Sequence, residues 1–214
     1  MRFRAAARLA AATGAILLTM SSCGDGSVDT SATYTFDPAD APVDVDSPQL
    51  RVAKDAAGIE ACPDTDLQAQ PVDRGLPALV LPCLGGGDAV NLAGIRTPAV
   101  INLWAQYCGP CRSESPRFQQ VHEAAGGDVS ILGIDWQDPL PGKAIAFAKE
   151  YGLTYPQLAD PDAATRAPLR ISALPVTLFV DAEGRVAHAV YGEVASTSEL
   201  VGLIEQHLGV VVTL

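Results

Sequence analysis

Apolar residues fall into two alternating kinds of run along the second half of the chain. Short, nearly continuous apolar runs indicate buried strands, and longer stretches with helical spacing indicate amphipathic helices. The expected strands cover residues 97–105, 129–136, 155–158, 175–180 and 185–190. The expected helices cover about residues 109–125, 142–151, 163–169 and 196–208. This alternation predicts an α/β fold with a central mixed β-sheet and helices on both of its faces.

Two shorter β-rich runs precede the first of these strands. They cover residues 78–81 and 89–92, and a Gly-Gly-Gly-Asp turn at residues 85–88 lies between them. This pattern is typical of a β-hairpin. We therefore expect the folded domain to span residues 77–214, with the hairpin at its start, and residues 51–76 to form an N-terminal extension.

The first 22 residues have the three regions of a secretory signal peptide. A basic start is followed by an apolar run over residues 9–18 and then by small residues immediately before Cys23. A membrane-spanning helix takes roughly 20 apolar residues, so a transmembrane segment is the weaker interpretation. Residues 20–23, Met-Ser-Ser-Cys, resemble a bacterial lipobox, in which the cysteine becomes the lipidated N-terminus. We expect lipidation of Cys23 to anchor the protein to a membrane.

The segment that follows has an unusual charge pattern. Residues 23–50 contain six acidic residues, three prolines and no lysine or arginine. Such a composition cannot bury enough apolar surface to offset the entropy lost on ordering. We therefore expect an acidic, disordered tether between the lipid anchor and the folded part.

The overall composition suits one ordinary domain with appended segments. The chain has 214 residues, of which 48% are apolar and 18% are charged. It contains 14 Lys and Arg residues against 25 Asp and Glu residues, and its net charge at pH 7 is -11. This sign opposes binding to the phosphates of nucleic acids or to anionic lipid headgroups. We expect no nucleic-acid partner.

Export changes how the cysteines are interpreted, because thiols outside the cytosol tend to be paired. With Cys23 lipidated, Cys62, Cys83, Cys108 and Cys111 remain, and four cysteines allow three connectivities. Cys108 and Cys111 form a C-x-x-C motif, so we expect a structural disulfide between Cys62 and Cys83. A zinc site built from all four thiolates is the alternative, although Cys62 and Cys83 do not form the short knuckle that such sites usually have. We predict no metal and no cofactor.

The C-x-x-C motif lies at the joint between an expected buried strand and the start of an expected helix. Free backbone N–H groups and the positive end of the helix dipole stabilise a thiolate there, which lowers the pKa expected for the first cysteine, Cys108. Pro110 suits the first helical turn, where its missing N–H costs nothing. Pro116 removes a hydrogen bond from the helix interior, and we expect a kink at that point.

The segment around this motif resembles the thioredoxin superfamily. The pattern Asn-Leu-Trp-Ala-x-x-Cys-Gly-Pro-Cys-x-x-Glu-x-Pro over residues 102–116 is similar to that of its exported, membrane-tethered TlpA/ResA-like thiol-disulfide oxidoreductases. Residues 174–177, Leu-Pro-Val-Thr, match the cis-proline loop of that family. The expected helix at residues 142–151 matches the insert of this branch. The resemblance covers about residues 77–208 and implies a thioredoxin-like fold.

The resemblance implies roles for three residues of the motif. Cys108 is the nucleophile that attacks a substrate disulfide, and Cys111 resolves the mixed disulfide. Glu114, one helical turn beyond Cys111, is the catalytic proton acceptor, with a solvated helix carboxylate as the alternative. Two positions depart from the family pattern. Tyr107 replaces the usual tryptophan, and Asn102 stands where thioredoxin itself has a buried aspartate, although the TlpA/ResA-like branch often has asparagine there.

Four further residues are expected to bind the substrate. Pro175, as a cis-proline, would present the backbone of Leu174 to an extended substrate beside Cys108, and a trans proline that opens a strand is the alternative. Trp104 is expected beside the disulfide, with a plain core aromatic as the alternative. Gly192 is expected to line the same groove or to serve only as a turn glycine.

The histidines, which we interpret as scattered surface or packing residues, are His122, His188 and His207.

These features predict an extracytoplasmic, lipid-anchored thiol-disulfide oxidoreductase. Because Gly-Pro between the cysteines resembles reducing thioredoxin, we expect it to reduce disulfides in exported proteins. The resemblance suggests apocytochrome c as a substrate and a transmembrane thiol carrier as the electron donor. The alternatives are an oxidising disulfide exchange protein and a copper-delivery protein of thioredoxin fold, which usually has three residues between its cysteines. A peroxiredoxin-type peroxidase would need threonine where Ala105 stands.

Overall fold

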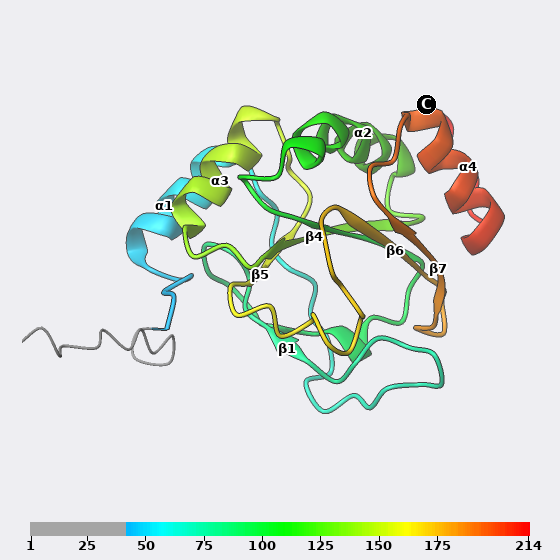
Figure 1. The fold of residues 1–214 in the computed structure, drawn as a ribbon, viewed down its shortest axis with the longest axis horizontal. Helices are drawn as coiled ribbons and strands as arrows, with labels where there is room; N and C mark the ends of the chain where they lie inside the picture. The colour runs from blue at the N-terminus through cyan, green and yellow to red at the C-terminus, as the bar shows by residue number, and fades with distance from the viewer. Residues whose placement is uncertain (1–41) are drawn as a thin grey trace, which may run out of the picture. The chain divides into compact units, whose positions relative to one another are not determined.

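The computed structural model describes residues 42–214, which form a five-stranded sheet with the strand order β5-β4-β3-β6-β7 (Figure 1). The strands are β3 (Ala99–Trp104), β4 (Ser130–Trp136), β5 (Gln157–Asp160), β6 (Val176–Val180) and β7 (Val186–Tyr191). The first three run parallel to one another, and β6 pairs antiparallel with both β3 and β7. The predicted α/β class and the central mixed sheet are confirmed.

Four α-helices of the described part cover one face of this sheet. They are α1 (Pro48–Ala57), α2 (Gly109–Ala125), α3 (Pro141–Glu150) and α4 (Thr197–Leu208). The helices α2 and α3 lie in the crossovers β3-α2-β4 and β4-α3-β5, which advance in the same direction across the sheet and therefore place both helices on the same face. Figure 1 shows all four helices above the strands. Their buried side chains share one core with alternate strand residues such as Val100 and Phe179.

The opposite face of the sheet has a separate core that loops and a small two-stranded sheet cover. Ile101 and Leu103 of β3 contribute to it, together with apolar residues around β1 (Val80–Leu81) and β2 (Val90–Asn91). β1 and β2 pair antiparallel. Within residues 42–214, no α-helix contributes to this core. The prediction of helices on both faces is therefore wrong for this face.

The missing helix is the one predicted over residues 163–169. This segment forms only turns. Pro168 has no N–H to donate to a helical hydrogen bond. Ala163, at the start of the predicted helix, and Arg170, just after its end, have φ angles of 52° and 55°, which are not helical. Pro168 is visible in the sequence, whereas the positive φ angles are known only from the structure.

The helix α1 was not predicted, because residues 42–50 were assigned to the disordered tether. Ser47 caps this helix by accepting a hydrogen bond from the N–H of Leu50 at 3.3 Å. Val45 is buried, and its carbonyl oxygen accepts a hydrogen bond from the N–H of Gly85 at 2.9 Å. The segment that contains Val45 and α1 packs on α3 and on the loop after β1. Local composition cannot reveal these distant contacts. The predicted signal peptide, Cys23 and residues 23–41 of the predicted tether lie outside the described residues.

A disulfide fastens the irregular segment between α1 and β1 to the rest of the domain. It joins Cys62 to Cys83, with the Cα atoms 6.0 Å apart. The predicted pairing of these two cysteines is confirmed. Both sulfurs belong to the core on the face of the sheet without helices.

Asn91 holds the same irregular segment from the side of β2. Its buried Nδ2 donates to the backbone carbonyl oxygens of Asp66, Leu67 and Ala69 at 3.0–3.2 Å. Its Oδ1 accepts from the N–H of Ala93 at 3.1 Å. One side chain thus satisfies backbone groups that would otherwise lack partners in a segment without strands or helices.

We expect Asn91→Ala to lower the free energy of unfolding by about 2–3 kcal/mol, because several buried backbone groups lose their partner at once. Chemical denaturation measures this change. Gln68→Ala, at an exposed position of the same loop, is the matched control and should change stability by less than about 0.5 kcal/mol. Equal stability of Asn91→Ala and the control would show that Asn91 does not hold the loop.

Candidate redox site

Two cysteines begin α2 directly after the central strand. β3 ends at Trp104, Cys108 is the N-cap residue of α2, and Cys111 lies in its first turn. The two sulfurs form a disulfide, with the Cα atoms 5.3 Å apart. All residues of β3 are buried and paired with β4 on one side and β6 on the other. The sheet therefore sets the position of this disulfide.

The two sulfurs differ in solvent access and in hydrogen bonding. Cys108 is 8% exposed, whereas Cys111 is fully buried. The N–H of Cys111 lies 3.3 Å from Cys108 Sγ, so this sulfur occupies the place of a capping oxygen. Once the disulfide is reduced, the N–H groups at the start of α2 would stabilise negative charge on Cys108.

The carboxyl group of Glu114 is buried one helical turn beyond Cys111. Its Oε1 accepts a hydrogen bond from Asn102 Nδ2 at 2.8 Å, and its Oε2 accepts one from the N–H of Val194 at 3.0 Å. Burial raises the pKa of Glu114 to about 7, against the two hydrogen bonds, which lower it. The structure thus rules out the alternative of a solvated carboxylate and places a buried carboxyl group with a raised pKa one helical turn from Cys111.

Val194 ties the loop after β7 to α2. Its N–H binds Glu114, and its carbonyl oxygen accepts a hydrogen bond from Arg117. The same guanidinium forms an ion pair with Glu193, with 2.9 Å between Nη1 and Oε1. Side chains of α2 therefore hold the loop that begins with Gly192.

The loop before β6 lies at the same end of the strands as the disulfide, and we call this end the redox edge of the sheet. The Leu174–Pro175 peptide bond is cis. Val176, the first residue of β6, pairs with Leu103 near the end of β3. The N–H of Gly192 donates to the carbonyl oxygen of Pro175 at 2.9 Å. The structure thus brings three predicted substrate-binding residues, Leu174, Pro175 and Gly192, to the edge at which α2 begins.

Trp104 lies inside the core between the sheet and the helices. Its ring stacks on Phe147 of α3, with centroids 4.7 Å apart, and its Nε1 donates to Gln157 Oε1 at 2.9 Å. It shares this core with Cys108 and Cys111. Its exposed fraction is 0%. The structure thus places Trp104 in the core that also contains the disulfide, and its part in substrate binding stays a prediction.

Two buried aspartates near the disulfide were not predicted. Asp135 pairs in register with Trp104 in the neighbouring strand, and Asp138 accepts a hydrogen bond from the N–H of Leu140 at 2.9 Å. Burial raises the pKa of both carboxyl groups, and the charge of Asp138 raises that of Asp135 further. One signal was available in the sequence, namely a charged residue inside an otherwise apolar strand.

Two of the three histidines are not scattered, as the sequence had suggested. His188 of β7 and His207 of α4 stack, with their ring centroids 4.0 Å apart. His122 of α2 hydrogen-bonds to Glu60, with 2.9 Å between Nε2 and Oε1. Among residues 42–214, no group of three or more His, Cys, Asp or Glu side chains is placed to hold a metal ion.

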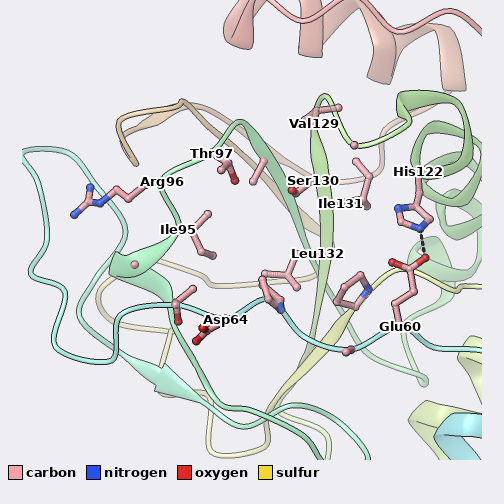
Figure 2. A pocket seen from close by; sticks show the side chains of 17 residues that line it. Glu60, Asp64, Ile95, Arg96, Thr97, His122, Val129, Ser130, Ile131 and Leu132 are labelled. Carbon is pink, nitrogen blue, oxygen red and sulfur yellow. Dashed lines mark hydrogen bonds and ion pairs between the residues drawn. The ribbon is translucent and has the colours of Figure 1, made fainter.

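A cavity of about 480 Å³ lies beside His122 and Glu60 (Figure 2). Segments 60–65, 94–99 and 127–132 form most of its walls, and Figure 2 shows Arg96 across from the His122–Glu60 pair. These walls include the starts of β3 and β4, whereas the C-x-x-C disulfide follows the end of β3. The cavity and the redox site therefore lie at opposite ends of these strands.

In the described part of the chain, no helix is both long and apolar enough to cross a membrane.

A disulfide at the first turn of the helix after the central strand, on a mixed sheet of this topology, is what defines the thioredoxin-like thiol-disulfide oxidoreductases. The sequence comparison is consistent with this class. The chain belongs to the AhpC/TSA family, whose pattern matches residues 72–189, more than half of its length. The predicted resemblance to the thioredoxin superfamily is confirmed.

Individual relatives agree with this assignment. The thiol:disulfide interchange protein HelX of Rhodobacter capsulatus is 30% identical over 142 residues, which cover 64% of this chain and 78% of HelX. The structure of a secreted thiol-disulfide isomerase from Corynebacterium glutamicum is similar with a TM-score of 0.55 and 28% identity, covering 68% of this chain and 94% of that one. A DsbF homologue from Corynebacterium diphtheriae is 36% identical, with a TM-score of 0.51, over 56% of this chain and 78% of that one.

Glu114→Gln should change how stability depends on pH. The pKa of Glu114 is raised from its ordinary value of 4.5 to about 7, so folding disfavours the ionised form. No penalty exists below about pH 4.5, where the carboxyl group is protonated in both states, and the full penalty of about 3 kcal/mol is present above pH 7. Relative to Glu114→Gln, the free energy of unfolding of the wild-type protein should therefore fall by this amount as the pH rises.

Denaturant titrations of the oxidised protein between pH 4 and 8 measure the difference. Glutamine fits the site, because Asn102 can rotate its amide and accept from the new Nε2 through its Oδ1, which has no hydrogen-bond partner within residues 42–214. Glu150→Gln, at an exposed position on α3, is the control and should follow the wild-type curve. If the free energies of unfolding of wild type and Glu114→Gln changed in parallel with pH, the raised pKa of Glu114 would be contradicted.

Proposed function

We propose that this protein reduces disulfide bonds in exported proteins through a dithiol formed by Cys108 and Cys111. The observation that carries the proposal is the asymmetry of the two sulfurs. Cys108 has access to solvent and a hydrogen-bond donor at the start of α2, and Cys111 has no exposed surface. Only Cys108 can therefore begin an exchange reaction with a protein disulfide.

In the first step, the thiolate of Cys108 attacks one sulfur of the substrate disulfide. A bond forms between Cys108 and that sulfur, the substrate disulfide breaks, and its electron pair leaves on the second substrate sulfur. The N–H groups of the first turn of α2 stabilise the thiolate before attack. The product of this step is a mixed disulfide between Cys108 and the substrate.

In the second step, Cys111 attacks Cys108 and releases the substrate as a dithiol. A buried thiol needs a base before it can attack, because burial disfavours its thiolate. Glu114 lies one turn away on the same helix, and its pKa of about 7 suits a group that accepts a proton near neutral pH. We assign the proton of Cys111 to Glu114 in this step.

Substrate binding is assigned to the edge formed by the cis-proline loop and the loop after β7. Leu174 is half-buried beside both cores, and Gly192 has a φ of 117°, which a residue with a side chain rarely adopts. A Cβ at Gly192 would meet no atom of the described residues within 4 Å, so these residues leave the space beside it open. An extended substrate segment could pair with the backbone of Leu174 there, as peptides add to other strand edges.

Sequence features support the reducing direction and the extracytoplasmic location. Gly-Pro between the cysteines resembles thioredoxin, whose potential is about -270 mV, rather than the oxidant DsbA at about -120 mV. The signal-like residues 1–22 and the lipobox cysteine Cys23 support an extracytoplasmic, lipid-anchored protein, and the related protein from C. glutamicum is described as secreted. Electrons would then come from a transmembrane thiol carrier, and apocytochrome c is a candidate substrate.

Cys108→Ser should reduce a model protein disulfide only at the background rate, because the attacking sulfur is missing. Cys111→Ser should still attack and then stop at the mixed disulfide, which is visible as a covalent complex on a nonreducing gel. Ser113→Ala, exposed on the same helix, should keep the wild-type rate. If Cys108→Ser formed the covalent complex and Cys111→Ser did not, the two roles would be reversed.

Equilibration with glutathione tests the direction. In a mixture poised at about -200 mV, a thioredoxin-like pair is mainly oxidised and a DsbA-like pair is mainly reduced. We expect Cys108–Cys111 to be mainly oxidised, as measured by acid quenching and mass spectrometry of the peptide that contains both cysteines. A mainly reduced pair would identify an oxidising exchange protein.

A further inference from the structure

Lys54 is a buried lysine whose amino group points at the second disulfide. It lies on α1 and is 6% exposed. Its Nζ donates to Cys83 Sγ at 3.0 Å and to the carbonyl oxygen of Gly86 at 2.8 Å. The loop of three glycines after Cys83 wraps closely around this lysine, since a Cβ at Gly85 would lie 2.8 Å from Lys54 Cβ.

No described carboxylate contacts this ammonium as a counter-ion. Among the residues that the structure describes, Lys54 forms no salt bridge. Asp55 and Asp46 act on it only from a distance, and Asp46 is already paired with Arg51 at 2.5 Å. Burial accordingly lowers the pKa of Lys54. A buried charge normally requires a paired partner, and a disulfide sulfur is a weak acceptor.

Reduction of the disulfide would supply the missing counter-ion. A Cys83 thiolate would lie against the ammonium, and charge-assisted hydrogen bonds of this kind are about twice as strong as neutral ones. The other sulfur lies beside a hydrogen-bond acceptor and not beside a donor, because Cys62 Sγ is 3.4 Å from the carbonyl oxygen of Gln157. That oxygen can accept a hydrogen bond from a thiol and would repel a thiolate. The reduced pair would therefore carry one proton, on Cys62.

We propose that Cys62–Cys83 is a second exchangeable disulfide, at which a small thiol reductant attacks Cys62 and Cys83 leaves as a thiolate held by Lys54. Cys62 is the more accessible residue of the pair, at 7% exposed against 1% for Cys83. The reductant sulfur bonds to Cys62, the Cys62–Cys83 bond breaks, and its electron pair stays on Cys83. A second thiol of the reductant then displaces Cys62, which takes up a proton, and the reductant ends as a disulfide.

Exchange at this site would free one wall of the cavity described above. Ala61 and Pro63, on either side of Cys62, both line that cavity, and the disulfide fastens them to the segment after β1. The two disulfides belong to separate cores, on opposite faces of the sheet. The proposal does not depend on the reaction assigned to Cys108.

The test uses the full chain equilibrated with mixtures of reduced and oxidised dithiothreitol, followed by acid quenching, alkylation and tryptic mapping. Cleavage after the existing Lys and Arg residues separates the cysteines by site. Residues 55–74 carry Cys62, residues 75–96 carry Cys83, and residues 97–112 carry the C-x-x-C pair. The last peptide is an internal control in every sample.

The expected result is a pH-dependent equilibrium constant for Cys62–Cys83. Dithiothreitol holds two protons below about pH 8, whereas the reduced pair would hold one, so the constant should rise up to tenfold per pH unit between pH 6 and 8. Lys54→Met should abolish this slope and require at least a tenfold higher dithiothreitol ratio at pH 7.5. Lys54→Arg, which keeps the charge, should retain the slope. The constant of the C-x-x-C pair should be the same in all three proteins.

Circular dichroism checks that each variant is folded. The pH dependence of the wild-type equilibrium constant tests the proposal even if a variant does not fold. A wild-type constant that does not change with pH would overturn it. So would equal constants for wild type and Lys54→Met, or a pair that stays oxidised at every ratio at which the protein remains folded. Any of these results would make Cys62–Cys83 a purely structural bond and would leave the function of Cys108 and Cys111 untouched.

Discussion

Burial of β3 on both faces is the constraint on which the redox site depends. All of its residues are buried, and its backbone pairs with β4 on one side and with β6 on the other. A shift of one residue would move Val100 and Trp104 from the helix-facing core into the opposite core, where other side chains already fill the space. The end of β3 is therefore fixed. So is the place of Cys108 at the first turn of α2.

One buried carboxyl group connects the elements that meet at this edge. Glu114 belongs to α2, Asn102 to β3 and Val194 to the loop after β7, and two hydrogen bonds join them. A buried carboxylate without donors would cost several kcal/mol, so these bonds make the burial of Glu114 tolerable. They do not cancel it, and the pKa stays near 7. Because residue 102 is a neutral amide, β3 and α2 share a single ionisable group at this point.

The two disulfides lie in separate cores, yet their surroundings have a common feature. In each pair, one sulfur lies close to a hydrogen-bond donor: Cys108 to the N–H of Cys111, and Cys83 to the ammonium of Lys54. A donor reduces the cost of negative charge on that sulfur alone. The donor is a helix N–H group in one case and a side-chain cation in the other. Similar chemical asymmetry thus arises from different structural elements.

Local patterns determined much of this protein. The apolar periodicity predicted the strands of the sheet and the helix after the C-x-x-C motif, and counting the cysteines predicted the Cys62–Cys83 pair. Tertiary structure alone decided that α1 is ordered, that Trp104 is buried, and that Glu114 and Lys54 are shielded from water. The reason is that burial depends on which distant segment packs over a side chain. A pattern along the chain shows which side chains favour a core, but not what covers them.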